Sequence, residues 1–346
     1  MKIALDSRPT RDLSGVGRYS RCLLDALRET AASGDEVLDM DRPSTAIRAR
    51  RPDVFHAPWI DGAMLHSPCP MVVTIHDLAH QQRRSEHLRG GLRQRLRPLA
   101  VQRAARVIVP TETVARDVVR HLRVDRRRVA VIPEAADRAM YPRPPAEIAR
   151  VKRHFALPER YLVWVGGLLH PDPDKHLAKL AATPRRLPLV LVGPTRPWAH
   201  ELESVTLTGR VSDEQLAAIY SGAHALVCSS DKEGFGLPAV EALACGTPVV
   251  ACEGPALREV LGERATFVPS GDMRALIERA QTASRPAPAP PDWSWLDAAR
   301  RTWHIYGEAC EAVEQPRLGA TPRVRRLRPN APGARAEGPL PPLEAQ

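Results

Sequence analysis

Short apolar runs separated by helix-length polar stretches mark the first half of the chain. The runs are KIALD at residues 2–6, DVFH at 53–56, MVVTI at 71–75, RVIV at 106–109 and VAVI at 129–132. After the first run, Gly15 and Gly17 lead into RYSRCLLDALRETA, whose apolar residues recur at helical spacing. Strands that alternate with helices are typical of a parallel sheet. The pattern therefore predicts an α/β unit that begins with a strand, a glycine loop and a helix.

A second series of the same kind starts with YLVWV at residues 161–165. It continues through LPLVLVG, SVTLTG, ALVCSS, TPVVAC and ATFVPS, and SDEQLAAIYSGA is one of the helical segments among them. Residues 142–160, between the two series, are rich in proline and charge, as connectors between domains are. A length of 346 residues agrees with about two domains. We therefore expect two doubly wound domains.

The C-terminal part of the chain differs from both series. Residues 284–292 form a second proline-rich linker, and residues 293–313 place Trp295, Trp303 and Tyr306 at helical spacing, which favours core packing. From residue 316 on, the chain has seven Pro and six Arg and almost no large apolar side chains, so it cannot bury enough surface to offset the cost of ordering. We predict a packed helix followed by a disordered basic tail.

Composition argues against a fibrous chain, a wholly disordered chain and a membrane-spanning chain. Apolar residues make up 43% and charged residues 26%, and no apolar run approaches the roughly 18 residues of a membrane-spanning helix. The N-terminus shows no signal-peptide pattern. The six Cys are scattered, without CxxC pairs or zinc-ligand spacing, so neither a disulfide scaffold nor a zinc site is indicated. We expect a cytoplasmic protein with reduced thiols.

The formal charge of +10 is concentrated in one region. Residues 83–128 carry fourteen Arg against four acidic residues, and the rest of the chain is nearly neutral. A positive face of this kind suits a nucleic acid, an anionic membrane surface or a phosphate-bearing substrate. A solvated arginine-rich helix face explains it equally well, because Arg accounts for 45 of the 50 basic residues of the whole chain. Nucleic-acid binding ranks lowest and is not predicted, since no reader motif or aromatic interleaving accompanies the charge.

The most informative motif is EGFGLPAVE at residues 233–241, which follows the predicted strand ALVCSS. A glycine loop that opens a helix turns backbone N–H groups toward an anion, which is the geometry of a phosphate site. Glu233 and Glu241 are eight positions apart, so one can lie in the loop and the other two turns along the helix. Carboxylates placed in this way can accept hydrogen bonds from sugar hydroxyls; two solvated acids are the alternative. For Gly236 and Gly246, a turn or a helix stop is the competing interpretation.

EGFGLPAVEALACGTPVVA resembles the E-x7-E signature of the family 4 retaining glycosyltransferases, of the group 1 type. The resemblance extends over residues 1–313 and includes LSGVGRYSRCLLDAL, VVTIHDL, VAVIPEAAD and VTLTGRVSDEQLAAIYSGAHALV in the usual order. It implies an α/β fold of GT-B architecture, with two Rossmann-like doubly wound domains facing across a cleft. We place an acceptor-binding domain at 1–150, a nucleotide-sugar-binding domain at 151–292, a crossing helix at 293–315 and the tail at 316–346.

The resemblance also assigns a donor site. It implies that Glu241 binds the ribose hydroxyls and that Glu233, with a catalytic role, contacts the donor sugar near the reacting carbon. On the same basis, the further donor-binding residues are Gly15, Gly17, Val211, Gly234, Phe235, Gly236 and Leu237. A loop without bulky side chains lets backbone amides approach a sugar closely.

Lys175 and His76 are assigned catalytic roles beside Glu233. Lys175, in GGLLHPDPDKHL, resembles the family's lysine that offsets the charge on the leaving diphosphate. Family members usually carry an arginine in this loop as well, whereas this chain has leucines and Asp174 nearby, which should weaken donor binding. His76 ends the predicted strand VVTIHD and resembles the histidine that touches the donor sugar, with a purely structural histidine as the alternative.

Arg18 and Asp77 are the predicted acceptor contacts. Arg18 follows the glycine loop and suits an anionic acceptor, while Asp77 has two alternative roles, orienting His76 or capping a helix. GVGRYS lacks the third glycine of a dinucleotide fingerprint, so a nicotinamide cofactor is disfavoured. DMD at 39–41 and DPD at 172–174 look like the metal-binding DxD of other glycosyltransferases, but such pairs are common. We predict no cofactor and no required metal.

The resulting expectation is a retaining hexosyltransferase. The resemblance implies transfer of a hexose, with mannose from GDP-mannose as the first choice, from a nucleoside-diphosphate sugar to a hydroxyl of a lipid-linked, phosphorylated or glycan acceptor. The basic region 83–128 adds the option of a peripheral position at the inner face of the membrane. A catalytically impaired nucleotide-sugar-binding or regulatory protein of the same fold is the alternative, because of the missing arginine and Asp174.

Overall fold

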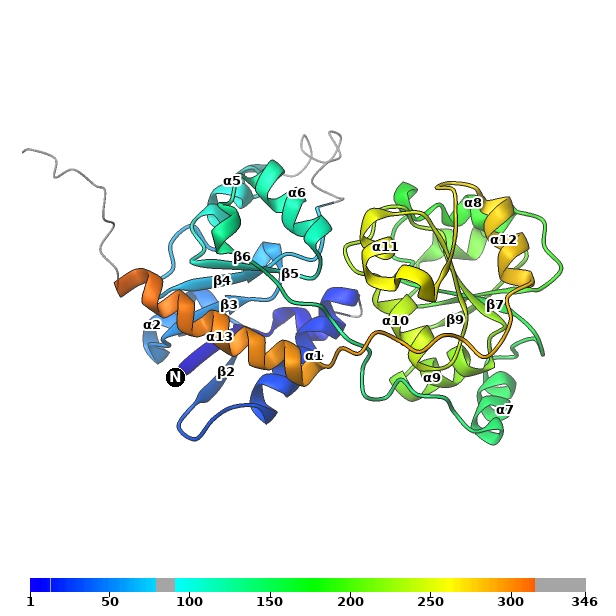
Figure 1. The fold of residues 1–346 in the computed structure, drawn as a ribbon, viewed down its shortest axis with the longest axis horizontal. Helices are drawn as coiled ribbons and strands as arrows, with labels where there is room; N and C mark the ends of the chain where they lie inside the picture. Colours follow the sequence, from blue (N-terminus) through cyan, green and yellow to red (C-terminus); the bar gives the residue numbers. More distant parts are fainter. Residues whose placement is uncertain (13, 79–90, 315–346) are drawn as a thin grey trace, which may run out of the picture. The chain divides into compact units, whose positions relative to one another are not determined.

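The computed structural model describes residues 1–12, 14–78 and 91–314. Within these ranges the chain forms two parallel six-stranded sheets, each flanked by helices (Figure 1). The strands are β1 (Lys2–Asp6), β2 (Glu36–Met40), β3 (Val54–Ala57), β4 (Met71–Thr74), β5 (Arg106–Val109), β6 (Val129–Val131), β7 (Leu162–Val165), β8 (Leu189–Val192), β9 (Val205–Gly209), β10 (Ala225–Cys228), β11 (Val249–Cys252) and β12 (Thr266–Val268). The α-helices are α1 (Gly15–Glu29), α2 (Pro43–Arg50), α5 (Gly91–Gln102), α6 (Glu112–Leu122), α7 (Pro145–His154), α8 (Leu177–Ala182), α9 (Asp213–Gly222), α10 (Leu237–Ala244), α11 (Pro255–Leu261), α12 (Met273–Gln281) and α13 (Trp295–Glu314). The prediction of two doubly wound parallel sheets is confirmed.

The first sheet has the strand order β2-β1-β3-β4-β5-β6. Side chains alternate between its faces: Ile3 and Leu5 pack in one apolar cluster with α1 and α13, and Ala4 packs in another with α5 and α6. Because both faces are covered, the inner strands are continuous apolar runs. The sequence analysis did not anticipate β2, because this edge strand is only partly buried and has Glu36 and Asp39 exposed.

The second sheet has the order β12-β11-β10-β7-β8-β9. Its strands also contribute to two clusters, one shared with α9, α10 and α11 and one shared with α8 and α12. The start of α9 follows from the sequence, because Ser212 and Gln215 form a reciprocal capping box. The six strands of this sheet coincide with the second series of apolar runs.

The expected connector at residues 142–160 contains a helix, α7, which the sequence analysis did not predict. Pro145 lies in the first turn together with Glu147, and Lys152 and Arg153 lie in the last turn, which suits the helix dipole. The helix α7 packs against α9 of the second sheet. In this segment the proline marks the first turn of a helix, and the acidic and basic residues lie at the ends that suit the helix dipole.

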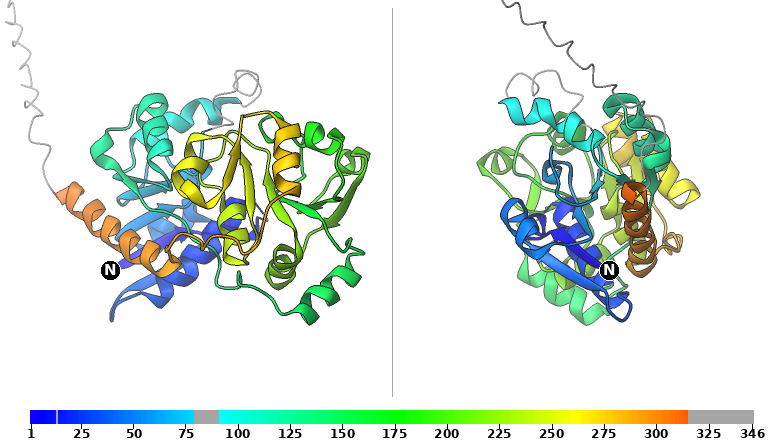
Figure 2. Two further views of the ribbon diagram at one scale, coloured as in Figure 1. Left: turned by 45° about the vertical axis from the view of Figure 1, so that its right-hand side comes forward. Right: turned by 90° about the vertical axis from the view of Figure 1, so that its left-hand side faces the viewer.

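Helix α13 follows the second sheet in the sequence but packs on the first. It contacts α1, β3, β4 and β5, and it lies alongside α1 (Figures 1 and 2). Trp295 and Tyr306 are buried, and the Tyr306 hydroxyl lies 2.7 Å from Nδ1 of His56 on β3. The aromatic stripe is core packing, as predicted.

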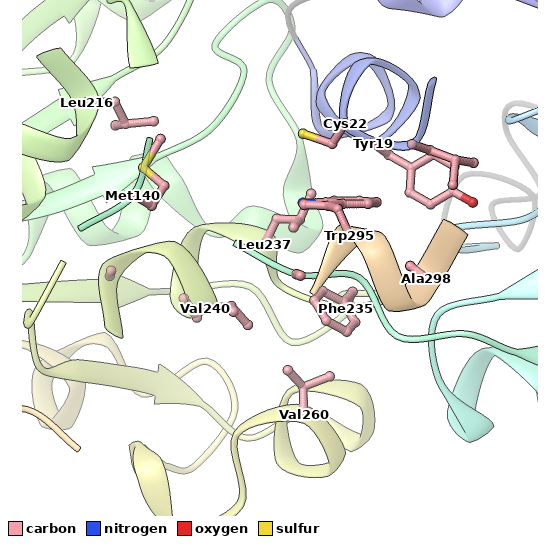
Figure 3. Close-up of a cluster of buried hydrophobic side chains, with 14 of the residues drawn as sticks. Tyr19, Cys22, Met140, Leu216, Phe235, Leu237, Val240, Val260, Trp295 and Ala298 are labelled. Carbon is pink, nitrogen blue, oxygen red and sulfur yellow. The ribbon is translucent and has the colours of Figure 1, made fainter. Parts of the chain in front are cut away.

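One apolar cluster connects the first sheet with the EGFG loop of the second. Figure 3 shows Tyr19 of α1, Trp295 of α13, and Phe235 and Leu237 near the start of α10 as members of it. The Tyr19 and Trp295 rings are 5.6 Å apart in an edge-on arrangement. The loop that carries the signature is therefore supported by packing from α1 and α13.

Within the part of the arginine-rich region that the structure describes, residues 91–128, several arginines bind other groups of the chain. Ion pairs join Arg97 to Asp61, Arg106 to Glu308, Arg126 to Glu112 and Arg127 to Asp125. Arg103 and Arg128 donate to backbone carbonyls. Part of the positive charge of this region is therefore offset within the chain. The predicted tail at 316–346 lies outside the described residues, and in the described ranges no helix has the length and apolar character needed to cross a membrane.

Candidate active site

A cavity of about 410 Å³ lies where loops of both sheets meet. It is lined from the first sheet by the start of α1 and the loops after β4 and β6, and from the second by the loops after β7 and β10. These are carboxyl ends of parallel strands, where doubly wound folds bind ligands. The predicted residues that line it are Gly15, His76, Asp77, Lys175, Glu233, Gly234, Phe235, Gly236 and Leu237.

The signature loop depends on two glycines. Gly236 precedes α10 with φ +89°, and an added Cβ would overlap the side chain of Leu257. A Cβ on Gly234 would overlap the carbonyl oxygen of His76, so the two loops touch backbone to backbone. The first residues of α10 line the cavity, so this helix directs its N-terminus there. Gly236 therefore has the turn conformation and also lines the cavity. Gly246, with φ +72°, follows the end of α10 and acts as a helix stop.

Glu233 is the signature acid in the cavity. Burial raises the pKa of Glu233 to about 7; the charge of Lys175 opposes the shift and Asp77 adds to it. Lys175 lines the same cavity, and its Nζ lies 5.9 Å from the centre of the Trp164 ring. A carboxylate and an ammonium group from two different loops therefore meet at one place.

Lys232 is a cavity residue that the sequence analysis missed. Its Nζ lies 3.3 Å from Oδ1 of Asp174, and both residues line the cavity. Asp174 was expected to weaken donor binding by placing an acid near Lys175, but Lys232 offsets its charge. Its place in the sequence could have indicated this role, because Lys232 directly precedes Glu233 in the signature loop.

His76 is held on both sides of its ring. Its Nδ1 lies 2.9 Å from Oε1 of Glu134, and its Nε2 lies 2.9 Å from the carbonyl oxygen of Pro58. Burial lowers the pKa of His76, but the hydrogen bond and charge of Glu134 outweigh this and leave it raised. Tyr19 packs edge-on against the ring at 4.5 Å between centroids. Glu134, which also lines the cavity, is a second residue that the sequence analysis missed.

Four predicted site residues do not line the cavity. They are Gly17, Arg18, Val211 and Glu241. Gly17 lies inside α1, where its bare Cα lets the helix pass the carbonyl oxygen of Asp12. Val211 lies between β9 and α9, packed against apolar residues. Their assigned roles in donor binding stay predictions.

Arg18 and Glu241 instead bind each other. Arg18 Nε lies 3.1 Å from Glu241 Oε1, and Arg18 Nη2 donates to Oδ1 of Asp213. The hydroxyl of Tyr220 donates to the second carboxylate oxygen of Glu241 at 3.4 Å. Burial raises the pKa of Glu241 to about 7, against the charge of Arg18. The predicted acceptor contact and the predicted ribose contact thus form one buried cluster, and both roles stay predictions.

The two DxD-like pairs differ in position. Asp39 lies on the edge strand β2 and pairs with Arg28, and Asp41 pairs with Arg11. Neither lines the cavity, whereas Asp172 and Asp174 do. The Asp172 side chain accepts a hydrogen bond from the Asp174 backbone N–H, and in the described ranges no three His, Cys, Asp or Glu side chains group as metal ligands would.

These features define a two-domain α/β protein with a cavity, lined by both acidic and lysine side chains, at the carboxyl ends of its strands. Residues 39–139 match the family described as Glycosyltransferase Family 4, and residues 159–284 match the family described as Glycosyl transferases group 1. The matches fall on both sheet units. The chain belongs to the group 1, family 4 glycosyltransferases, as the sequence analysis predicted.

Curated relatives agree with this family. The chain is 26% identical to O-antigen chain mannosyltransferase B of Escherichia coli over 263 residues, 68% of this chain and 66% of the relative. It is 30% identical to the D-inositol 3-phosphate glycosyltransferase of Gordonia bronchialis over 242 residues, 61% of this chain and 53% of the relative. The matched part thus spans between half and two thirds of these relatives' length.

Solved structures share the fold. Sucrose-phosphate synthase from Thermosynechococcus elongatus superposes with a TM-score of 0.63 at 20% identity, covering 91% of this chain and 94% of that one. Anabaena HepE, crystallised with UDP-glucose, gives 0.64 at 17% identity, covering 90% and 98%. At these identities the likeness concerns the fold, and it confirms the GT-B architecture.

Proposed function

We propose that the protein is an active glycosyltransferase that moves a hexose from a nucleoside-diphosphate sugar to an acceptor hydroxyl, with retention of the anomeric configuration. The observation that carries the proposal is the meeting of Glu233, Lys175 and the N-terminus of α10 in one cavity. A helix N-terminus and an ammonium group suit a diphosphate, and a carboxylate suits the hydroxyls of a sugar. Lys232 supplies a second cation to the same lining.

The reaction needs no covalent enzyme intermediate. The bond between the anomeric carbon and the leaving phosphate oxygen breaks, and a bond to the acceptor oxygen forms on the same face. The acceptor's hydroxyl proton passes to the departing phosphate. Lys175 stabilises the charge that develops on the leaving group, and Glu233 orients the sugar, so the protein acts mainly by positioning and by charge.

The donor of first choice is GDP-mannose. A relative named as an O-antigen chain mannosyltransferase supports mannose. A structural neighbour crystallised with UDP-glucose is the reason to test UDP-sugars as well. We propose that neither a cofactor nor a metal ion is required. An impaired nucleotide-sugar-binding protein is the less favoured candidate, because Lys232 offsets the charge of Asp174, one of the two features that had motivated it.

The proposed acceptor is lipid-linked, phosphorylated or a glycan, reached from the cytoplasmic side. Arg116, Arg120 and Arg123, on and just after α6, are exposed and are the proposed contacts to anionic lipid. Pelleting with vesicles tests this point. Binding that requires anionic lipid and weakens with salt is expected, and equal binding to neutral vesicles would contradict a charge-based contact.

The donor site is tested by calorimetry with GDP-, UDP- and ADP-sugars, in EDTA and then with Mg²⁺. One donor should bind without metal, and Lys175→Ala and Glu233→Gln should each weaken it about tenfold or more, as the loss of a charge-assisted hydrogen bond does. Lys179→Ala is the matched control, because Lys179 is exposed on α8 and outside the cavity. Hydrolysis or transfer of the bound donor separates an enzyme from an impaired binder. Equal effects of all three variants would contradict the proposed site.

A further inference from the structure

The hydrogen bonds of His76 fix where its protons lie. Nε2 faces the carbonyl oxygen of Pro58 at 2.9 Å, and a carbonyl oxygen only accepts, so Nε2 carries a hydrogen. Nδ1 faces Oε1 of Glu134, also at 2.9 Å. A neutral imidazole has one N–H group and would already have used it on Pro58. A second proton must therefore lie between Nδ1 and the Glu134 carboxylate.

The groups around His76 favour that proton on the ring. Glu134, after β6, is 4% exposed and places a carboxylate in direct contact, and Asp77, the next residue in the chain, adds a further negative charge. The Tyr19 phenol from α1 packs against the ring and is neutral, since burial raises its pKa. His56 from β3 is neutral too, because burial and the charge on His76 lower the pKa of His56 to about 3.

His56 provides an internal contrast. Its Nδ1 lies 2.7 Å from the Tyr306 hydroxyl, and its Nε2 lies 2.9 Å from the Thr74 hydroxyl. A hydroxyl can donate or accept, so a neutral ring satisfies both contacts. Two histidines in one domain therefore have different partners, and only those of His76 demand two N–H groups.

We propose that Glu134 holds His76 as an imidazolium whose two N–H groups both donate within the protein, so that His76 serves the cavity as a fixed cation and not as a proton acceptor. Neither ring nitrogen is then free to bind the donor sugar, which modifies the role predicted from the sequence. The first sheet contributes a positive charge to the cavity in this way, whereas both cavity lysines come from the second. Glu134 acts as a positioning residue through His76.

The chemical use of this cation rests on the proposed function. A positive charge that lines the cavity favours a reaction in which negative charge develops on a departing phosphate. The protonation state itself does not depend on any donor or acceptor. A ligand-free measurement can therefore test the inference even if the proposed reaction is wrong.

The test is nuclear magnetic resonance of the full chain labelled with ¹⁵N-histidine and titrated without ligand, with His76→Asn to assign the signal. In the wild type, both ring nitrogens of His76 should be protonated at pH 7, with a midpoint above the ordinary 6.5. In Glu134→Gln, which keeps an acceptor oxygen but removes the charge, the midpoint should fall below 6.5. Glu253→Gln, at an exposed pair with Arg258, should leave it unchanged.

Two results would overturn the proposal. One is a wild-type His76 with a single protonated nitrogen at pH 7, and this result decides the question even if Glu134→Gln does not fold. The other is a folded Glu134→Gln protein in which His76 stays doubly protonated. If the protein turns over a donor, the alkaline loss of kcat should also move to lower pH in Glu134→Gln, whereas a merely structural role would change kcat without moving the profile.

Discussion

Breaking the buried pair between Arg18 and Glu241 should destabilise the fold strongly and in a pH-dependent way. The side chains are 14% and 2% exposed, and the pair joins α1 to α10. If Arg18 is removed, Glu241 keeps only the Tyr220 hydroxyl at 3.4 Å among the contacts given by the described residues. If Glu241 is neutralised, Arg18 keeps Asp213, which is 42% exposed and so partly solvated.

The magnitudes follow from what stays buried. Removing one partner of a buried pair costs about 3–5 kcal/mol, because the other charge remains without compensation. Arg18→Met should fall in this range at pH 8. It should cost less at pH 5, because burial raises the pKa of Glu241 to about 7 and a protonated carboxyl carries no charge to bury. Glu241→Gln should cost less than Arg18→Met at pH 8. The double variant should cost about 1–3 kcal/mol less than the sum of the two.

Thermal and guanidinium unfolding of the wild type, the two single variants and the double variant at pH 5 and pH 8 measures these costs. The exposed pair of Arg274 and Glu278 on α12 is the control, and its double-variant cycle should show no coupling. Additive costs for Arg18 and Glu241, or an equal cost of Arg18→Met at both pH values, would refute the reasoning. Donor binding by Glu241→Gln, measured at a temperature where this variant is still folded, then tests the predicted ribose contact separately from folding.

Three further changes test other parts of the structure. Glu233→Gln should raise Tm at pH 8 and not at pH 5. The reason is that the pKa of Glu233 is raised to about 7, so the wild type loses stability as the pH rises through that value. Equal shifts of Tm at both pH values would contradict this. Gly234→Ala should abolish donor binding measured by calorimetry and lower Tm, because its Cβ would overlap the His76 carbonyl oxygen, whereas Gly167→Ala, with open space at the same cavity, should fold normally. Gly307→Ala in the middle of α13 should raise the free energy of unfolding by about 0.5–1 kcal/mol, since nothing lies within 4 Å of its Cβ position; a loss of stability would show that the helix needs the glycine.

Much of the fold could be predicted because burial leaves a periodic trace in the sequence. Strands such as β5 and β8 are covered on both faces and appear as continuous apolar runs, and the Ser212–Gln215 capping box marks the start of α9 locally. The half-exposed edge strand β2 left too weak a trace, and the proline and charge of residues 142–160 concealed α7. The position of the signature loop also followed from the sequence, because it comes directly after an apolar run.

The partners of the charged side chains were decided only by the tertiary structure. Glu134 is 58 positions from His76, Lys232 is 58 from Asp174, and Asp213 is 195 from Arg18. Hydrophobic periodicity reports which face of an element is buried, but it carries no information on which distant polar group lies opposite. Those pairings arise when the crossing of α13 and the apolar cluster around Trp295 bring the loops of two sheets together. Sequence thus determined the sheets and the family, and packing determined whether His76, Arg18 and Glu241 are free or bound.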